Sequence, residues 1–538
     1  MKRGVSRYRA VVLCATVVAG VVFAASPGAQ QVIQQVSVRQ VRAPTIVAPK
    51  VEPPRVIEPR VPQSKPQAQL PTIPADLLAA YTEAAERGLN YLPGRVLVKF
   101  KQGVGRDGRQ RALQALTSRP SVDGLEWIGD IAIVKDPTQT DARVLAAQMG
   151  SQPEVEFAEP DYLQHPTVIP TDPSYAVRQW NLAQIGMPRA WDLAGGGSAQ
   201  VIVAVVDTGV TAVPLQNVTV QTWNGGAIVN YSMPVGPSPD FTLSRFVSPR
   251  DFTISTSAPP AFVVDTDGHG SHVAGTVGED TNNGIALAGV AYNVRIMPLK
   301  ACQSYWDVQF ARSAAGIPGF APTDSGGCPS SATAAAIRFA ADNGAKVLNY
   351  SIGGTSQNMA TRDAMVYAVS RGVFIAMSNG NEFNDGNPTT FPAFFAPSIQ
   401  GAVSVAAVTR SETRASYSST GSFTEIAAPG GDGTNPIYQA SIRFSDSNES
   451  FVVFPRFDRY DERGMAGTSM ASPHVAGSAA LLISYYLQPP RNVTLSPGTI
   501  EGILTGTTKD LGSRGRDNDF GLGLVQPFRA LYGLGLRR

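Results

Sequence analysis

Short apolar segments alternate with longer amphipathic ones along most of the chain, from about Trp180 to Phe528. The apolar segments indicate strands, and they lie at residues 201–206, 294–299, 346–352, 373–377, 403–408 and 424–428. The segments with helical periodicity include residues 331–343, 361–371 and 470–487. Because the strand segments are apolar at nearly every position, we expect both of their faces to be covered. The pattern therefore predicts an α/β fold of three layers, with a parallel sheet between two layers of helices.

A smaller pattern precedes this one, at residues 76–165. It consists of a strand at 94–100, a helix near 107–117, strands near 125–134, a helix at 140–150 and a strand near 155–158. The order βαββαβ is typical of a small two-layer α+β domain. The stretch 165–175 has three prolines and no core pattern, so it predicts a loose connection to a large domain at 172–538.

The first 75 residues have no globular pattern. Lys2, Arg3, Arg7 and Arg9 precede an apolar run that ends near Ala25, and small residues follow. This arrangement predicts a secretory signal at 1–25, because the run is shorter than the ~20 residues of a membrane span. A membrane anchor is the alternative. Residues 26–75 are rich in proline and predict an extended linker. The protein is therefore expected to be secreted, to the extracellular space or the periplasm.

The charge and composition of the chain limit the classes of binding partner that we expect. The chain has 44 Lys+Arg against 42 Asp+Glu, a net charge of +2, which argues against nucleic acid as a partner. Hydrophobic residues make up 43% of the sequence, enough to bury a real core. No later segment is apolar enough to span a bilayer, so no membrane partner is expected after signal removal. A monomer is the default expectation for an exported protein of this kind.

Three cysteines are present, and Cys14 lies within the predicted signal. Cys302 and Cys328 flank a stretch rich in Gly, Pro and Ser. In an exported protein an isolated pair most simply forms one disulfide that closes this loop. Two free buried thiols are the alternative.

Three residues have the chemistry and the placement of a catalytic triad. Asp207 ends an apolar strand segment, His269 stands between glycines before a helix, and Ser469 stands at a helix start. A serine hydroxyl needs a base to take its proton, an imidazole can do so near neutral pH, and a carboxylate can hold the imidazole in the right tautomer. Taken singly, Asp207 could be a turn residue and Ser469 a helix cap. Gly268, Gly270, Gly467 and Ala471 are expected to let a substrate backbone come close.

These three segments, in the order Asp, His, Ser, resemble those of the subtilisin family of serine peptidases. The resemblance implies that Asn381, in the segment SNGNE, donates to the oxyanion; Asn379 is the competing assignment. It also implies that the strand end NYSIGG pairs with extended substrate. The residues expected to bind substrate in this way are Ser351, Ile352, Gly353 and Gly354.

The segments GRVLVKFK and VEFAEPDYLQH resemble the inhibitory prodomains of secreted subtilisins. The resemblance therefore implies a zymogen that cuts itself between Leu163 and Tyr175, with its own prodomain as an intramolecular inhibitor. It implies no cofactor for catalysis. Structural calcium is common in the family, and Asp280, Asn282 and Asn283 fit either a calcium loop or an Asn-Gly-rich turn that holds no metal. The long interval between Asp207 and His269 predicts an extra surface loop.

The sequence thus predicts a secreted serine endopeptidase that hydrolyses peptide bonds of polypeptide substrates through an acyl-enzyme. An exported scaffold of the same fold that binds peptides without cleaving them is the alternative. An aspartic peptidase using Asp207 and Asp324 would leave His269 and Ser469 unexplained. An α/β-hydrolase esterase would need a Gly-x-Ser-x-Gly turn and the triad order Ser, Asp, His, and the segment around Ser469 has neither.

Overall fold

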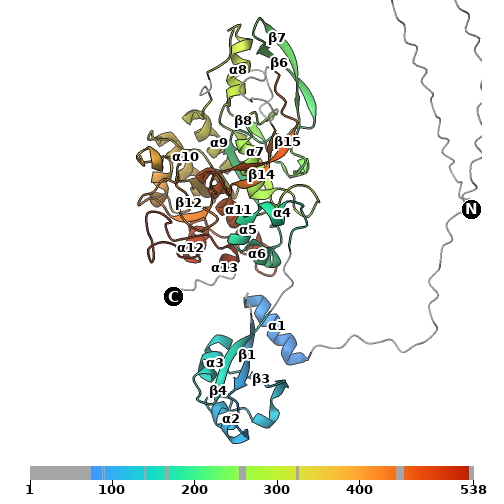
Figure 1. Cartoon of the computed structure of the whole chain (residues 1–538), viewed down its shortest axis with the longest axis vertical. Coiled ribbons are helices and arrows are strands. Elements are labelled where there is room, and N and C mark those ends of the chain that lie inside the picture. The colour runs from blue at the N-terminus through green and yellow to red at the C-terminus, as the bar shows by residue number, and fades with distance from the viewer. Residues whose placement is uncertain are drawn as a thin grey trace, which may run out of the picture. The chain divides into compact units, whose positions relative to one another are not determined.

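The computed structural model describes residues 74–87, 89, 91–138, 141–163, 169–253, 262–322, 326–443 and 454–531. The predicted signal, nearly all of the predicted linker and Asp324 lie outside these residues. Figure 1 shows two folded parts in the described chain, and each is considered by itself.

The first part, at residues 74–163, is a four-stranded antiparallel sheet in the order β2-β3-β1-β4. Val96, Val98 and Leu145 belong to the core between the sheet and the helices α2 and α3. The predicted order of elements is found, and a helix that the sequence analysis did not predict, α1, precedes it. Its sequence, ADLLAAYTEAAER, has the amphipathic periodicity of a helix, so the signal was present and was overlooked. The elements are α1 (Ala75–Arg87), β1 (Tyr91–Phe100), α2 (Arg106–Leu113), β2 (Glu126–Ile128), β3 (Ile131–Lys135), α3 (Ala142–Gly150) and β4 (Val155–Tyr162).

The second part is built on a seven-stranded sheet in the order β13-β12-β11-β10-β5-β9-β8, in which every neighbouring pair is parallel. All six predicted strand segments are found in it, within a few residues. The strands are β5 (Ile202–Asp207), β8 (Arg250–Asp251), β9 (Arg295–Lys300), β10 (Val347–Tyr350), β11 (Phe374–Ser378), β12 (Ala402–Val408) and β13 (Ile426–Pro429).

Helices cover both faces of this sheet, as predicted. One core cluster joins the sheet to α6, α7 and α11, and the other joins it to α9 and α10. The helix α11 contributes a run of fully buried small and apolar side chains, so it packs directly on the sheet. The bounds are α4 (Tyr175–Arg178), α5 (Trp180–Gln184), α6 (Met187–Ala194), α7 (His269–Gly278), α9 (Ser330–Asp342), α10 (Met359–Ser370), α11 (Thr468–Leu487), α12 (Pro497–Gly506) and α13 (Pro527–Leu531).

Two segments inserted between sheet strands come together beside the sheet. The interval between Asp207 and His269 holds a hairpin of β6 (Gln216–Trp223) and β7 (Ile228–Val235), where the sequence predicted a loop. The stretch between Cys302 and Cys328 holds α8 (Tyr305–Ala314), which packs against β6 through a separate apolar cluster that includes Trp306. Figure 1 shows α8 beside β6 and β7. A further pair, β14 (Ile437–Ile442) and β15 (Tyr460–Met465), was also not predicted.

Candidate active site

Asp207 is the last residue of β5, a strand inside the sheet between β10 and β9. Its side chain is almost fully buried, with 1% exposed. Its backbone carbonyl accepts hydrogen bonds from the N–H groups of Ala301 (2.8 Å) and Cys302 (3.2 Å), just beyond β9. The carboxylate is therefore presented from a rigid position at the carboxyl end of the sheet, where such folds carry their ligands.

His269 is the first residue of α7 and lies against this carboxylate. Its Nδ1 is 2.6 Å from Oδ1 of Asp207, and the N–H of Thr208 donates to the same oxygen at 2.8 Å. Burial lowers the pKa of His269, but the charge and hydrogen bond of Asp207 outweigh burial and raise that pKa to about 9. An Nδ1–H donated to Asp207 leaves Nε2 as the proton acceptor, which is the tautomer that a general base needs.

A second buried carboxylate, Asp265, organises the loop before His269. It accepts hydrogen bonds from the N–H groups of Asp267 (3.0 Å) and Gly268 (2.9 Å), and from the Thr208 hydroxyl (3.0 Å). It also accepts from the N–H (2.8 Å) and the hydroxyl (2.7 Å) of Ser271. Sequence reasoning missed this role, although an acidic residue four positions before the candidate base was a visible signal.

The glycines around His269 serve internal packing, which corrects the expectation that they admit the substrate backbone. A Cβ at Gly270 would lie 2.1 Å from the carbonyl oxygen of Gly209, so no larger residue fits there. Gly268 has a φ of +96°, a conformation that side chains with a Cβ rarely adopt, and a Cβ there would lie 2.7 Å from the Ser441 hydroxyl.

Ser469 is the second residue of α11, and its hydroxyl donates to the carbonyl of Ser351 at 3.2 Å. Ser351 in turn donates its hydroxyl to the carbonyl of Ser469 at 2.8 Å. Beneath them, Asn349 donates to the Ser351 hydroxyl (2.9 Å) and accepts from the Ser472 hydroxyl (2.8 Å). No hydrogen bond joins Ser469 to His269 within the described chain, although both side chains line one cavity.

Asn381 lies at the same helix start. Its Oδ1 accepts from the N–H (2.9 Å) and the hydroxyl (3.0 Å) of Thr468. These bonds fix the amide and leave Nδ2 without a hydrogen-bond partner among the described residues. Asn379, the competing assignment, is fully buried and donates to the Ser419 carbonyl (2.5 Å) and the Thr424 hydroxyl (3.1 Å). The geometry therefore favours Asn381 as a donor into the cavity.

Of the segment predicted to bind substrate, Ser351 and Ile352 follow β10, and Gly353 and Gly354 are exposed. Gly354 is already paired, because its N–H donates to the Phe391 carbonyl (3.0 Å) and its carbonyl accepts from the Phe391 N–H (2.8 Å). Ser351, Ile352 and Gly353 line the cavity, and Gly354 does not. The edge open to a peptide therefore ends at Gly353.

The cavity that these residues share has a volume of about 270 Å³. Its walls are formed by Asp207, Thr208, His269, Cys302, Cys328, Ser351, Ile352, Gly353, Ser378, Gly380, Asn381, Glu382 and Ser469. Cys302 and Cys328 are joined by a disulfide in its wall. Apart from Gly354, the structure thus brings every predicted catalytic, substrate-binding and disulfide residue to one cavity.

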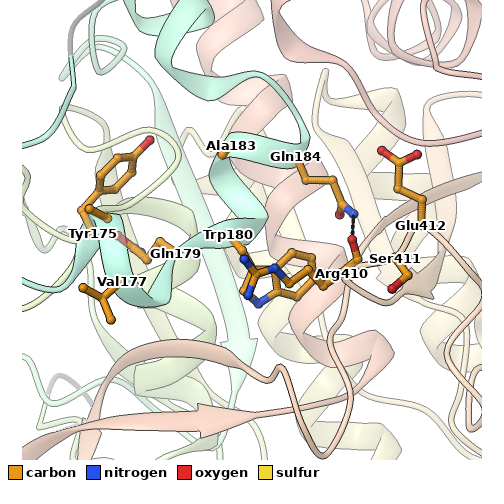
Figure 2. Close-up of a pocket in the computed structure, with 10 residues that line it drawn as sticks. Tyr175, Val177, Gln179, Trp180, Ala183, Gln184, Arg410, Ser411 and Glu412 are labelled. Atoms are coloured by element: carbon orange, nitrogen blue, oxygen red, sulfur yellow. Dashed lines mark hydrogen bonds between the residues drawn. The ribbon is translucent and has the colours of Figure 1, made fainter.

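A larger cavity, of about 520 Å³, lies between the segment Tyr175 to Gln184 and the loop of Arg410, Ser411 and Glu412. Figure 2 shows Gln184 donating to the carbonyl of Arg410 across it, at 3.1 Å. None of the predicted site residues lines this cavity. The volume of a cavity therefore does not by itself identify the candidate active site.

Two further histidines, His272 and His474, are buried packing residues of their helices. Burial lowers the pKa of His272 to about 3 and that of His474 to about 4. His272 Nε2 is 2.9 Å from the Ile437 carbonyl, and His474 Nδ1 is 2.8 Å from the Met470 carbonyl. Neither histidine lines the cavity of Ser469.

Asp280, Asn282 and Asn283, the candidate residues of a calcium loop, each bond to a different part of the protein. Asp280 pairs with Arg245 and accepts from the N–H (2.8 Å) and the hydroxyl (2.6 Å) of Thr242. Asn282 accepts from the N–H of Thr171 at 3.0 Å. Asn283 donates to Asp240 at 2.7 Å. Across the described chain, no group of three or more His, Cys, Asp or Glu side chains is placed to hold a metal ion.

Comparison with known proteins decides the family. The model of the Subtilase family (Peptidase S8) matches residues 198–523. The chain belongs to the subtilase family. The model of the fervidolysin N-terminal prodomain matches residues 78–161 of this subtilase, the part that contains the four-stranded antiparallel sheet. The predicted family, fold class and enzyme class are confirmed.

The subtilase is similar to several curated proteases. It is 30% identical over 397 residues to the thermophilic serine proteinase of Bacillus sp. strain AK1, which covers 73% of this chain and 79% of the relative. It is 29% identical over 315 residues to thermitase of Thermoactinomyces vulgaris, covering 59% and 85%. It is 29% identical over 468 residues to the extracellular basic protease of Dichelobacter nodosus, covering 80% of this chain and 69% of the relative.

Among the described residues of the subtilase, none of the helices has the length and apolar character of a membrane span.

Proposed function

We propose that this subtilase is a secreted, self-processing endopeptidase in which Ser469 is the nucleophile, His269 the general base and Asp207 the residue that orients it. The observation that carries the proposal is the meeting of Ser469, His269 and Asn381 in one cavity, with Asp207 2.6 Å from the imidazole. The hydroxyl of Ser469, which bonds to the Ser351 carbonyl and not to His269, is the observation that would suit an inactive peptide-binding scaffold, but Ser469, His269 and Asn381 all line the cavity, which favours the enzyme.

In the first step, His269 takes the proton of the Ser469 hydroxyl through Nε2 as Oγ attacks the carbonyl carbon of the scissile bond. The hydroxyl must turn from the Ser351 carbonyl toward the imidazole. Catalytic hydrogen bonds are often loose in the free enzyme and tighten when substrate binds. The imidazolium then gives its proton to the leaving amine, and the acyl-enzyme remains on Ser469. Water, activated by the same imidazole, releases the acid product.

The negative charge of the tetrahedral intermediate forms beside Asn381 and the N-terminus of α11. The Nδ2 amide is fixed before substrate arrives, because Oδ1 is held by Thr468. A preorganised donor of this kind stabilises the transition state by about 3 kcal/mol. An extended peptide would pair with Gly353, whose N–H and C=O lack backbone partners within the described chain. Main-chain pairing supplies affinity that depends little on sequence, which suits broad polypeptide substrates.

The prodomain is proposed to dock on the peptidase domain through the sheet face opposite α2 and α3. The register places Ile128, Ile131, Lys99 and Phe157 side by side on that face. Ile128 and Phe157 are 58% and 37% exposed, an apolar surface that docking would cover. Its tail would then be cut between Leu163 and Tyr175; residues 164–168 lie outside the described chain. The similarity to the extracellular basic protease of Dichelobacter nodosus supports secretion.

A structural calcium ion is proposed at Asp172 and Asp240 rather than at Asp280, and because two carboxylates do not fill its coordination shell, backbone carbonyls and water would supply the other oxygen ligands. Both carboxylates are buried and bind one loop: Asp172 accepts from the N–H of Asn282 at 2.9 Å, and Asp240 from that of Leu287 at 3.2 Å. Burial, with a smaller contribution from the charges of Asp172 and Asp280, raises the pKa of Asp240 to about 7. Calcium takes oxygen ligands of this type and would relieve the repulsion.

The calcium proposal is tested by thermal unfolding with calcium or with a chelator. We expect calcium to raise the Tm of the parent protein and to have a much smaller effect on Asp240→Asn. Asp280→Asn is the matched control, and it should keep the calcium response. An equal rise in Tm with calcium in Asp240→Asn and in the parent would show that calcium does not bind at Asp172 and Asp240.

The endopeptidase proposal is tested by intact mass of the exported protein with and without a phosphonyl fluoride. We expect a mature species that begins between Leu163 and Tyr175 and carries one adduct on Ser469. Ser469→Ala should remain uncut and unlabelled, while Ser411→Ala, an exposed serine, should behave as the parent. Normal processing of Ser469→Ala in the absence of any other protease would exclude Ser469 as the nucleophile.

A further inference from the structure

Lys300, the last residue of β9, is a charged side chain buried beneath the acid–base pair. It is 3% exposed, and its Nζ donates to the carbonyl of Thr208 at 2.8 Å. The same Nζ donates to the Thr266 hydroxyl at 3.3 Å and pairs with Asp307 at 2.8 Å. Thr208 follows Asp207 in the chain, and Thr266 stands three residues before His269. One ammonium group therefore contacts both loops that carry the pair.

Asp307 belongs to the insertion that the disulfide closes, and α8 holds it in place. It forms a capping box with Ser304, in which the N–H of Ser304 donates to Asp307 Oδ2 at 2.8 Å. The Thr266 hydroxyl donates to Asp307 Oδ1 at 2.9 Å and is 2.7 Å from the Ser304 hydroxyl. The helix start is therefore connected to the loop before His269 as well as to Lys300.

We propose that Lys300 and Asp307 are a positioning pair through which the Cys302–Cys328 insertion tunes the catalytic acid–base pair. This inference rests on the proposed function. Removal of one partner of a buried ion pair leaves an uncompensated charge in a medium that screens it poorly. Because the pair touches both catalytic loops, that charge would act on His269.

The charges around His269 give the sign of the effect. The carboxylates near His269 or Lys300 are Asp207 on β5, Asp251 on β8, Asp265 and Asp267 before α7, Asp307 on α8, and Glu382 in the cavity wall. Burial lowers the pKa of Lys300, but Asp307, Asp265 and Asp251 outweigh it and raise that pKa, so Lys300 stays charged. Its positive charge opposes protonation of His269, and Asp307 partly cancels that effect.

The pair therefore predicts opposite effects of its two members. Asp307→Asn exposes His269 to the full charge of Lys300 and should lower the pKa of His269 by about half a unit. Lys300→Met removes the cation and should raise that pKa by a similar amount. In the double variant the two changes oppose each other, so the pKa should return toward that of the parent. A merely structural role would give shifts in one direction or none.

The experiment is an NMR titration of the His269 imidazole in the full chain carrying Ser469→Ala, which does not depend on activity. Asp363→Asn is the matched control, because it removes a carboxylate from an exposed ion pair with Arg338 on α9 and α10. We expect a shift to lower pH in Asp307→Asn, to higher pH in Lys300→Met and none in Asp363→Asn. The folding of Lys300→Met is checked by circular dichroism. If this variant does not fold, the direction of the His269 pKa shift in Asp307→Asn decides the test.

The same variants in the active enzyme separate this inference from the proposed function. The acid limb of kcat/KM should move by the same amounts as the imidazole titration. A parent enzyme that neither cleaves peptides nor labels at Ser469 would overturn the proposed function but not the NMR result. An active parent with an unshifted His269 in Asp307→Asn would overturn the positioning pair alone.

Discussion

The two halves of the active site are held by different forces. The half that contains Asp207 and His269 is surrounded by buried charges, among them Asp265 and the Lys300–Asp307 pair. In the half that contains Ser469 and Asn381, the side chains are fixed by neutral hydrogen bonds from residues such as Asn349 and Thr468, and the nearest carboxylate, Glu382, contacts the backbone N–H of Asn381. We therefore expect proton affinity and geometry to be controlled separately: changes in the charged half should move pH profiles, and changes in the neutral half should lower rates without moving them.

Substitution of Ser469 or of His269 should lower kcat more than any other change. The two losses should be similar, although the residues belong to different halves of the active site. Ser469→Ala and His269→Gln are each expected to lower kcat by about 10⁴-fold or more, because nucleophile and base act as a unit. The combination should cost little more than either change alone. Additive losses, measured on a peptide anilide with prodomain-free enzyme, would show that the two side chains act independently.

Asn381→Ala should lower kcat by about 10²–10³-fold, because the donor acts on charge that appears only in the transition state. KM and the apparent pKa of the acid limb should stay close to those of the parent. Asn384→Ala, an exposed asparagine in the same loop, is the control and should have no effect. A loss that appears in KM instead would place Asn381 in ground-state binding.

Asp265→Asn should combine a smaller loss with a moved pH profile. The change removes a negative charge that stabilises the imidazolium, so the pKa of His269 should fall and the acid limb should move to lower pH. The amide also cannot accept all the bonds from Gly268 and Ser271, so the free energy of unfolding should drop by about 1–3 kcal/mol. Chemical denaturation and a kcat/KM profile measure the two effects. An unmoved profile would contradict the electrostatic part.

Asn349→Leu should have the smallest effect, about 10-fold in kcat. The substitution leaves the hydroxyls of Ser351 and Ser472 without their shared partner, which loosens the support under Ser469. Because no charge is removed, the pH profile should not move. A profile that shifts as far as that of Asp265→Asn would show that the two halves are not separate.

The same contrast explains which parts of the structure were predictable from the sequence. The six strands and α11 were predicted because burial on both faces leaves a continuous apolar pattern, and Asp207, His269 and Ser469 stand in motifs. The hairpin of β6 and β7 was expected as a loop because its stability depends on α8, which follows much later in the chain. Lys300 and Asp265 were missed for the same reason, since a buried charge is recognisable only from partners that the fold supplies.

The pairing of Gly354 with Phe391 shows what could not be predicted from the sequence within the active site. The motif NYSIGG identified the strand end, but the position at which the edge closes depends on a loop beyond β11. The choice between Asn379 and Asn381 likewise depended on which side chain the neighbouring segments bury. The motifs predicted the chemistry that we propose, and tertiary contacts favour Asn381 over Asn379 as its donor.

If Ser469 attacks with His269 as its base, the rate at which a phosphonyl fluoride labels Ser469 must depend on pH. Attack requires neutral His269. Burial lowers the pKa of His269, but Asp207, Asp267 and Asp265 outweigh burial and raise that pKa to about 9. The second-order rate constant for labelling Ser469, followed by intact mass, should therefore rise mainly above neutral pH, with an apparent pKa above the usual value of about 6.5. Asn381→Ala should lower the whole curve without moving it. A labelling rate independent of pH, or an adduct on another residue, would contradict the account.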